Sequence, residues 1–149
     1  MNDISVVKIN KLPLGELLPF QVESENEGFQ LINKLITEYE NGKNRFDKPG
    51  EVLFAVYFQK RMVGIGGLNR DPYSSDNVTG RIRHVYVLNQ VRRLGIGSLL
   101  INQIIKEARL SFHVLTLRTL TETGCLFYEK LGFQKTTKLN GATHFLVLK

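Results

Sequence analysis

The chain has 149 residues, which is the size of one ordinary domain, and its 42% hydrophobic and 23% charged content is typical of a globular protein. One cysteine excludes an internal disulfide, and no apolar run approaches the roughly 20 residues that span a bilayer. The net charge of +6 favours anionic partners without selecting one, and the N-terminal residues lack a signal peptide's apolar core. We therefore expect one domain over residues 1–149, located in the cytoplasm.

In chain order, the first half of the sequence predicts one strand, two helices and a pair of strands. The first helix is short and interrupted by Pro19. The second is amphipathic, because Phe29, Ile32 and Ile36 recur at helical spacing. A polar loop follows, and then two strands joined by a tight turn. The predicted ranges are 4–10 for the first strand, 16–22 and 26–40 for the helices, and 51–59 and 61–69 for the strand pair.

The second half alternates strands and helices before a final hairpin. A strand, helix and strand over 82–120 predict a right-handed crossover between parallel strands, and the other pairings should be antiparallel. The ranges are 82–88 (strand), 95–110 (helix), 113–120 (strand), 121–132 (helix), and 133–139 with 143–149 for the hairpin around Asn140-Gly141. The sequence thus predicts an α/β fold with a mixed, mainly antiparallel sheet of about seven strands, helices on both faces and a central βαβ crossover.

The passage from the third long strand into the next helix is the sharpest chemical signal, a basic turn over Arg92–Ser98 with two glycines. The first N–H groups of a helix lack internal partners and carry the positive end of its dipole. Glycines let a bulky anion approach the backbone, and Arg92 and Arg93 add mobile positive charge. The turn therefore predicts a phosphate or pyrophosphate cradle. A turn that merely redirects the chain is the alternative, whereas a dinucleotide fold is disfavoured because Leu100 stands where its third glycine should be.

At this turn the sequence resembles the GNAT superfamily of N-acetyltransferases, whose signature is Arg/Gln-x-x-Gly-x-Gly/Ala. The stretch Arg92-Arg93-Leu94-Gly95-Ile96-Gly97 matches that signature. A second stretch, Cys125-Leu126-Phe127-Tyr128-Glu129-Lys130-Leu131-Gly132-Phe133, is similar to the family's helix that ends in an aromatic residue, Tyr, Glu, Lys, a variable residue, Gly and Phe. The element order also matches, over about residues 4–148.

The resemblance implies acetyl-coenzyme A as the cosubstrate, with a V-shaped slot for its pantetheine arm where strands 82–88 and 113–120 splay apart. Backbone groups of Val85 and Val87 should pair with that arm, and the amides from Arg93 to Ser98 should hold the pyrophosphate. Thr121 stands where the family often has asparagine, and threonine can still donate a hydrogen bond. The cofactor-binding residues expected on this basis are Val85, Tyr86, Val87, Arg92, Arg93, Leu94, Gly95, Ile96, Gly97, Ser98, Thr121 and Phe127.

The resemblance also implies that Tyr128 lies near the cofactor sulfur. A tyrosine keeps its proton at neutral pH, so Tyr128 can protonate the thiolate that leaves when an amine attacks the thioester. A base must take a proton from the attacking ammonium. The strand over 82–88 offers no carboxylate, which leaves His84 or a chain of waters. A Cys125 nucleophile is disfavoured, because no histidine is close in sequence to activate it and free cysteines usually pack in the core.

Arg81 and Arg83 are candidate substrate contacts, because they would favour a carboxylate or phosphate on the acceptor if they face the slot. Otherwise they are two solvated arginines at a strand entrance. His144, on the last hairpin, is a further candidate substrate contact. Strand alternation places Arg81, Arg83 and Val85 on one face and Ile82, His84 and Tyr86 on the other, unless a bulge near Val85–Val87 resets the parity.

Together these features predict transfer of an acetyl group from acetyl-coenzyme A to a primary amine of a small-molecule or peptide acceptor, by direct attack in a ternary complex. A non-catalytic acyl-CoA sensor of the same fold is the alternative. A nucleic-acid binder is disfavoured, because the basic residues are dispersed and no basic stripe with interleaved aromatics occurs. We expect no metal site, no nucleic-acid or membrane partner, and a monomer or homodimer.

Overall fold

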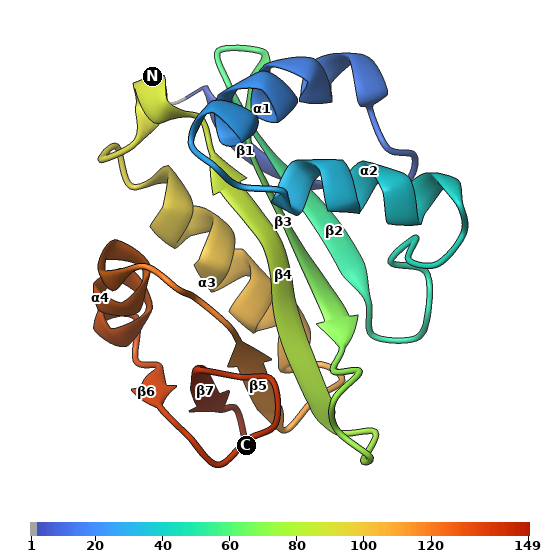
Figure 1. The fold of residues 1–149 in the computed structure, drawn as a ribbon, viewed down its shortest axis with the longest axis vertical. Coiled ribbons are helices and arrows are strands. Elements are labelled where there is room, and N and C mark those ends of the chain that lie inside the picture. Colours follow the sequence, from blue (N-terminus) through green and yellow to red (C-terminus); the bar gives the residue numbers. More distant parts are fainter. Residues whose placement is uncertain (1–2) are drawn as a thin grey trace.

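A seven-stranded sheet in the order β1-β2-β3-β4-β5-β7-β6 forms the centre of the computed structural model, which describes residues 3–149 (Figure 1). The strands are β1 (Ile4–Lys8), β2 (Val52–Phe58), β3 (Arg61–Arg70), β4 (Thr79–Val87), β5 (Val114–Leu117), β6 (Gln134–Lys135) and β7 (His144–Val147). The helices are α1 (Leu14–Asn26), α2 (Leu31–Glu40), α3 (Ile96–Ala108) and α4 (Glu122–Lys130), with a 3₁₀ turn, η1 (Asn89–Val91), before α3. The predicted element order and fold class are confirmed, and β4 with β5 is the parallel pair.

Helices cover both faces of the sheet, with α1 and α2 in front of it and α3 behind it in Figure 1. The apolar residues of α3 recur every three or four positions, so Ile96, Leu100 and Ile104 are at most 1% exposed beneath the sheet. On the other face, Phe20 of α1 and Leu35 of α2 are equally buried. Within residues 3–149, none of the helices combines the length and the apolar character needed to cross a membrane.

The two N-terminal helices are confirmed, but their bounds differ from the predicted 16–22 and 26–40. α1 continues past Pro19, and α2 starts only at Leu31. The break between them contains Gly28, whose φ of 86° lies in the left-handed region that glycine adopts without strain. Phe29 therefore lies in the link between the helices, partly exposed, and not on the buried stripe of a longer helix.

A β-bulge in β4 changes which side chains share a face of the sheet. Ile65 of β3 pairs with Tyr86 of β4, and Gly67 pairs with Arg83. These two pairs are two residues apart on β3 but three residues apart on β4, so β4 contains one extra residue. His84, within this bulge, has a φ of 60°. His84 and Tyr86 both contact the N-terminal helical segment, as Arg83 does, whereas Val85 packs toward α3. Simple strand alternation was therefore wrong beyond Arg83, because the extra residue resets the parity.

The parallel strands β4 and β5 pair only at their first residues, Thr79–Arg81 with Val114–Thr116. Beyond these pairs β4 continues beside β3, while β5 ends at Leu117 and pairs with β7 on its other side. The two strands thus separate toward their carboxyl ends, as expected for the segments 82–88 and 113–120. The turn into α3 and the start of α4 follow these carboxyl ends directly (Figure 1).

Candidate active site

The turn from β4 into α3 presents a row of backbone N–H groups. Within residues 3–149, the amides from Arg93 to Ser98 find no acceptor, and the bonding of the helix begins with Leu99 N to Gly95 O at 3.0 Å. Arg93 and Gly95 have φ values of 71° and 80°, so the backbone curls its N–H groups into a concave run. This run, at the positive end of a 13-residue helix, suits a phosphate or pyrophosphate.

The two glycines of the turn have different surroundings. A Cβ at Gly97 would lie 3.3 Å from Cζ of Phe127 and 4.0 Å from Cγ2 of Val87. A Cβ at Gly95 would meet nothing within 4 Å. The turn therefore has a wall made by Val87 and Phe127, and an open side at Gly95 through which a bulky anion can enter.

The Arg92 guanidinium is fixed in place, and the expected mobile charge is therefore absent. It donates to Glu27 at 3.1 Å from both Nη1 and Nη2, and from Nε to Val87 O at 2.9 Å. It also lies 5.1 Å from the ring centroid of Tyr86. Arg92, and after it the Tyr86 hydroxyl, hold the pKa of Glu27 below its usual value. Arg92 thus ties the turn to α1, and the exposed Arg93 is left to add positive charge at the turn.

Tyr128 is held by aromatic neighbours and is 9% exposed. Its ring centroid lies 5.0 Å from that of Phe127 and 5.6 Å from that of Phe133, both edge-to-face. In the described part of the chain the hydroxyl has no hydrogen-bond partner, and it is not among the polar atoms sealed from solvent. Burial raises the pKa of Tyr128 above its usual value, so the hydroxyl keeps its proton at neutral pH. A rigidly held hydroxyl that keeps its proton suits a general acid.

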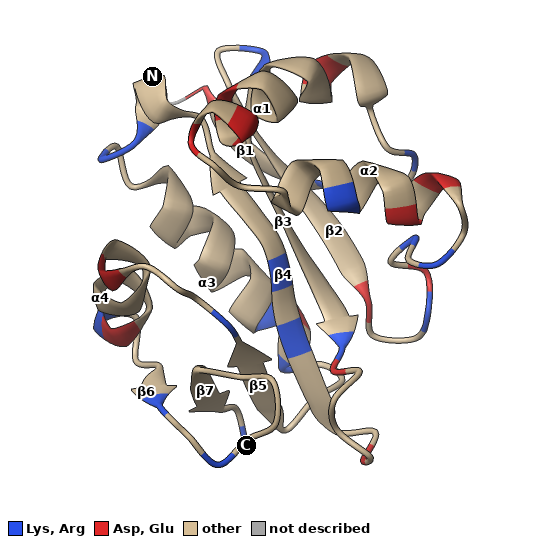
Figure 2. Ribbon diagram, viewed as in Figure 1, with Lys and Arg blue, Asp and Glu red and all other residues tan. Residues whose placement is uncertain are grey.

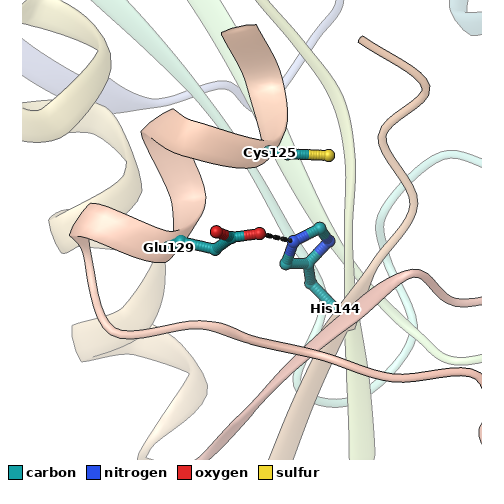
Figure 3. A group of neighbouring side chains, drawn as sticks. All are labelled: Cys125, Glu129 and His144. Atoms are coloured by element: carbon teal, nitrogen blue, oxygen red, sulfur yellow. Dashed lines mark hydrogen bonds and ion pairs between the residues drawn. The ribbon is translucent and has the colours of Figure 1, made fainter. Parts of the chain in front are cut away.

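α4 and β7 bring together Cys125, Glu129 and His144 (Figure 3). Cys125 and Glu129 share one face of α4 because they are four residues apart, and His144 reaches them from β7. His144 Nε2 lies 2.8 Å from Glu129 Oε2, and Nδ1 lies 2.9 Å from Thr143 Oγ1. Both ring nitrogens thus have partners other than Cys125, although the sulfur lies within 4.8 Å of His144. His144, which is 1% exposed, therefore links α4 to β7 and offers little surface to a substrate.

His84 lies in the bulge of β4 and faces the start of α2. Its Nδ1 lies 3.0 Å from the carbonyl oxygen of Leu31, so Nδ1 carries the proton. Nε2 is buried and has no partner among the residues described. Burial, and then the charge of Arg83, lower the pKa of His84 to about 3. The imidazole is therefore neutral at pH 7 and only a weak base, which disfavours the predicted role of His84 in proton removal.

The low pKa of His84 predicts an acid-sensitive fold. Its folded-state pKa of about 3 lies below the usual 6.5, so its contribution to stability is complete above pH 6.5 and is lost as the pH falls toward 3. The loss can reach about 1.4 kcal/mol per pH unit. The variant His84→Asn keeps a donor near Leu31 and cannot titrate, so its unfolding free energy should fall less between pH 7 and pH 5. Urea denaturation at both pH values measures this, with His113→Asn, at an exposed histidine, as the control. Equal losses in the wild type and His84→Asn would contradict the assignment.

The two arginines of β4 have different environments on the α1–α2 face. Arg81 donates to the carbonyl oxygen of Gly141 at 2.7 Å, lies 4.9 Å from the ring centroid of Tyr73 and is 7% exposed. Arg83 lies 3.6 Å from Glu38 of α2 and is more accessible. Arg81 therefore anchors the loop between β6 and β7, while Arg83 is open to a ligand from the α2 side.

Thr121 is the N-cap of α4, where its Oγ1 accepts the N–H of Gly124 at 3.0 Å. Capping uses an oxygen lone pair, so the hydroxyl proton stays available to a ligand. Sequence analysis did not identify the carboxylates that hold the basic side chains around the site, because their partners lie in distant segments. They include Glu27 with Arg92, Glu38 with Arg83, Asp71 with Arg81 and Glu129 with His144.

The fold is shared with several solved acetyltransferase structures. An acetyltransferase-type protein from Exiguobacterium sp. 255-15 is 33% identical over 97% of this chain and 93% of that chain, with a TM-score of 0.85. A GNAT-family acetyltransferase from Staphylococcus aureus Mu50 is 17% identical over 98% and 99% of the two chains, with a TM-score of 0.77. An acetyltransferase from Streptococcus agalactiae 2603 is 16% identical over 97% and 98%, with a TM-score of 0.78. No curated protein matches the chain significantly.

The family model of the acetyltransferase (GNAT) domain matches residues 49–135. That range is more than half of the chain and contains the turn Arg92–Ser98, the separating strands β4 and β5, and the helix with Tyr128. The expected resemblance is confirmed on the residues that carry it, and the chain belongs to the GNAT acetyltransferase family.

Proposed function

We propose that this protein transfers the acetyl group of acetyl-coenzyme A to a primary amine of a small-molecule or peptide acceptor, by direct attack in a ternary complex. The observation that carries the proposal is the run of backbone N–H groups from Arg93 to Ser98, which have no acceptor among residues 3–149. A pyrophosphate would satisfy several of these donors at once, and it can approach from the open side at Gly95.

The pantetheine arm would follow the opening between β4 and β5. Beyond its three pairs with β5, β4 has no strand on that side within residues 3–149, so outward backbone groups of Val85 and Val87 would be able to bond an extended ligand. The carbonyl oxygen of Val87 already accepts the Arg92 Nε proton, which leaves its N–H for the arm. This path leads from the turn toward Tyr128, whose neighbour Phe127 packs against Gly97.

The reaction needs one proton donor and one proton acceptor. The amine nitrogen would attack the thioester carbonyl, a C–N bond would form, and the C–S bond would break with the electron pair leaving on sulfur. Tyr128 would protonate the sulfur. The amine's proton would leave through water and replace the one that Tyr128 gave up, because His84, with a pKa of about 3, is too weak a base. Cys125 takes no part in this proposal, because His144, its nearest base, is directed by its hydrogen bonds to Thr143 and Glu129.

A non-catalytic acyl-CoA sensor is the second candidate, favoured by the absence of a strong base on β4. It would bind acetyl-coenzyme A equally well but release no thiol when amines are added.

We further propose that the protein acts in the cytoplasm as a monomer or homodimer, without nucleic acid or a membrane. The dispersed basic residues of a +6 chain support only weak, salt-sensitive binding to nucleic acid.

Thermal unfolding with and without ligands tests the cofactor. Acetyl-coenzyme A at about a hundredfold excess over its Kd should stabilise the fold by roughly 2.7 kcal/mol. A panel of amines should then release free thiol, detected by a colorimetric thiol reagent. A DNA duplex at physiological salt should produce no comparable stabilisation. Stabilisation by DNA and none by acetyl-coenzyme A would overturn the proposal, while binding without thiol release would favour the sensor.

A further inference from the structure

A cationic pocket lies between α2, the loop that follows it and β4, on the face of the sheet opposite α3. Figure 2 shows basic positions on each of these three elements. Its volume of about 320 Å³ suits a small metabolite. Six basic side chains against three acidic ones give its lining a formal charge of +3, half of the +6 carried by the whole chain. The basic residues are Lys34, Lys43, Arg45, Lys48, Arg70 and Arg83, and the acidic residues are Glu38, Asp47 and Glu51.

Most of this positive charge is not neutralised by the protein. In the described part of the chain, Arg83 is the one basic lining residue within ion-pair distance of a carboxylate, 3.6 Å from Glu38. Glu51 accepts the backbone N–H groups of Lys48 at 3.2 Å and Arg70 at 2.9 Å, so its charge is directed at the backbone. The pocket therefore attracts an anion of matching size.

Arg83 is the lining residue of the pocket that lies nearest along β4 to the segment that separates from β5. It stands immediately before the bulge, two residues and about 7 Å along the strand from Val85. Figure 2 shows the two basic residues of β4 as successive bands on the strand beside α2. Arg81, the other of the two, is occupied by the carbonyl of Gly141. A small molecule held at Arg83 could therefore extend one end toward the bulge.

We propose that this pocket binds an anionic group of the acceptor, so that the preferred substrates are amines that carry a carboxylate or a phosphate. This inference rests on the proposed transfer to an amine. Arg83 is the residue that determines specificity, because a guanidinium binds both kinds of anion in a bidentate manner. The exposed Lys34 and Lys43 add attraction at the rim.

Matched acceptors test the inference. L-leucine is compared with L-leucinamide, and phosphoethanolamine with ethanolamine, so that each pair differs in the anionic group and the two pairs separate carboxylate from phosphate. Two readouts are taken: kcat/KM with acetyl-coenzyme A, and calorimetric binding to the chain loaded with coenzyme A. At least one anionic member should be favoured over its neutral partner by about tenfold or more.

Variants show where the preference arises. Arg83→Gln should raise KM for the favoured anionic acceptor by about 10- to 100-fold and leave the neutral partner unchanged. Lys34→Gln, at an exposed site, should act in the same direction and cannot be attributed to unfolding. Arg109→Gln, an exposed arginine after α3, is the matched control and should change nothing.

The outcomes distinguish a failure of the proposed anion site from a failure of the proposed acetyl transfer. Transfer that is equally efficient to both members of each pair, or a preference that survives in Arg83→Gln, would overturn the pocket and leave the transfer standing. Tighter binding of the anionic members with no acetylation would support the pocket and contradict the proposed transfer. A preference for the neutral members in both readouts would exclude an anion site.

Discussion

Replacing Tyr128 with phenylalanine should lower the turnover number about 10²- to 10⁴-fold, which is the usual contribution of a general acid. The ring stays packed against Phe127 and Phe133, and the hydroxyl that is lost has no partner within residues 3–149. Stability and the Kd for acetyl-coenzyme A should therefore change little. The pKa of Tyr128 is raised above the value near 10 that is usual for tyrosine. Wild-type turnover should therefore not fall through deprotonation of Tyr128 at any pH below about 10.

Steady-state kinetics on an acetylated acceptor, with a parallel melting curve, measure both effects. Tyr57→Phe is the matched control, because that tyrosine lies on β2 and its hydroxyl bonds Glu16 at 3.1 Å. Its turnover should equal that of the wild type. If Tyr128→Phe retained wild-type turnover, Tyr128 would be a packing residue, and the thiolate would take its proton from water.

Replacing Gly97 with aspartate should raise the Kd for acetyl-coenzyme A about 100-fold. A carboxylate about 5 Å from a phosphate costs about 3 kcal/mol at an effective dielectric of about 20. At a concentration that gives the wild type roughly 2.7 kcal/mol of stabilisation, the variant should gain roughly 0.4 kcal/mol. Thermal unfolding with and without the cofactor measures the difference.

Asparagine at the same position is the matched control. Any side chain on Gly97 meets the ring of Phe127 at about 3.3 Å, so Gly97→Asn reproduces the steric effect without the charge. Gly97→Asp should bind acetyl-coenzyme A at least tenfold more weakly than Gly97→Asn, and the difference should shrink in high salt. If the two variants bound acetyl-coenzyme A with equal affinity, the pyrophosphate would not bind at this turn.

The sequence predicted the elements whose signals are local. The helix after Gly95 has a strong apolar stripe, the hairpins have turn residues, and the crossover follows from the order of strand, helix and strand. The run of unpaired N–H groups at the start of α3 was also predictable, because any helix start leaves its first backbone N–H groups without partners. The boundary between α1 and α2 was misplaced, since α1 continues to Asn26 and the positive φ of Gly28 breaks the chain inside the range predicted for the second helix.

Side-chain roles that depend on distant partners could not be predicted. The position of His84 depends on one extra residue in β4 and on the carbonyl of Leu31, 53 residues away. Strand alternation alone contains neither feature. Similarly, Arg92 appeared mobile because Glu27, its partner, lies 65 residues earlier in the chain. The residue types of the site could thus be read from the sequence, but the roles of His84 and Arg92 depend on a bulge and two long-range contacts that the sequence does not reveal.

The route of the acetyl group tests the central claim most directly. The protein is mixed with acetyl-coenzyme A labelled in the acetyl group, quenched within one turnover, and analysed by intact mass spectrometry with and without an amine acceptor. Direct attack predicts an unmodified chain in both cases and label in the N-acetylated acceptor, formed at the same rate as free thiol. A chain that gains one acetyl group on Cys125 before the acceptor does, or no labelled product with any amine, would contradict it.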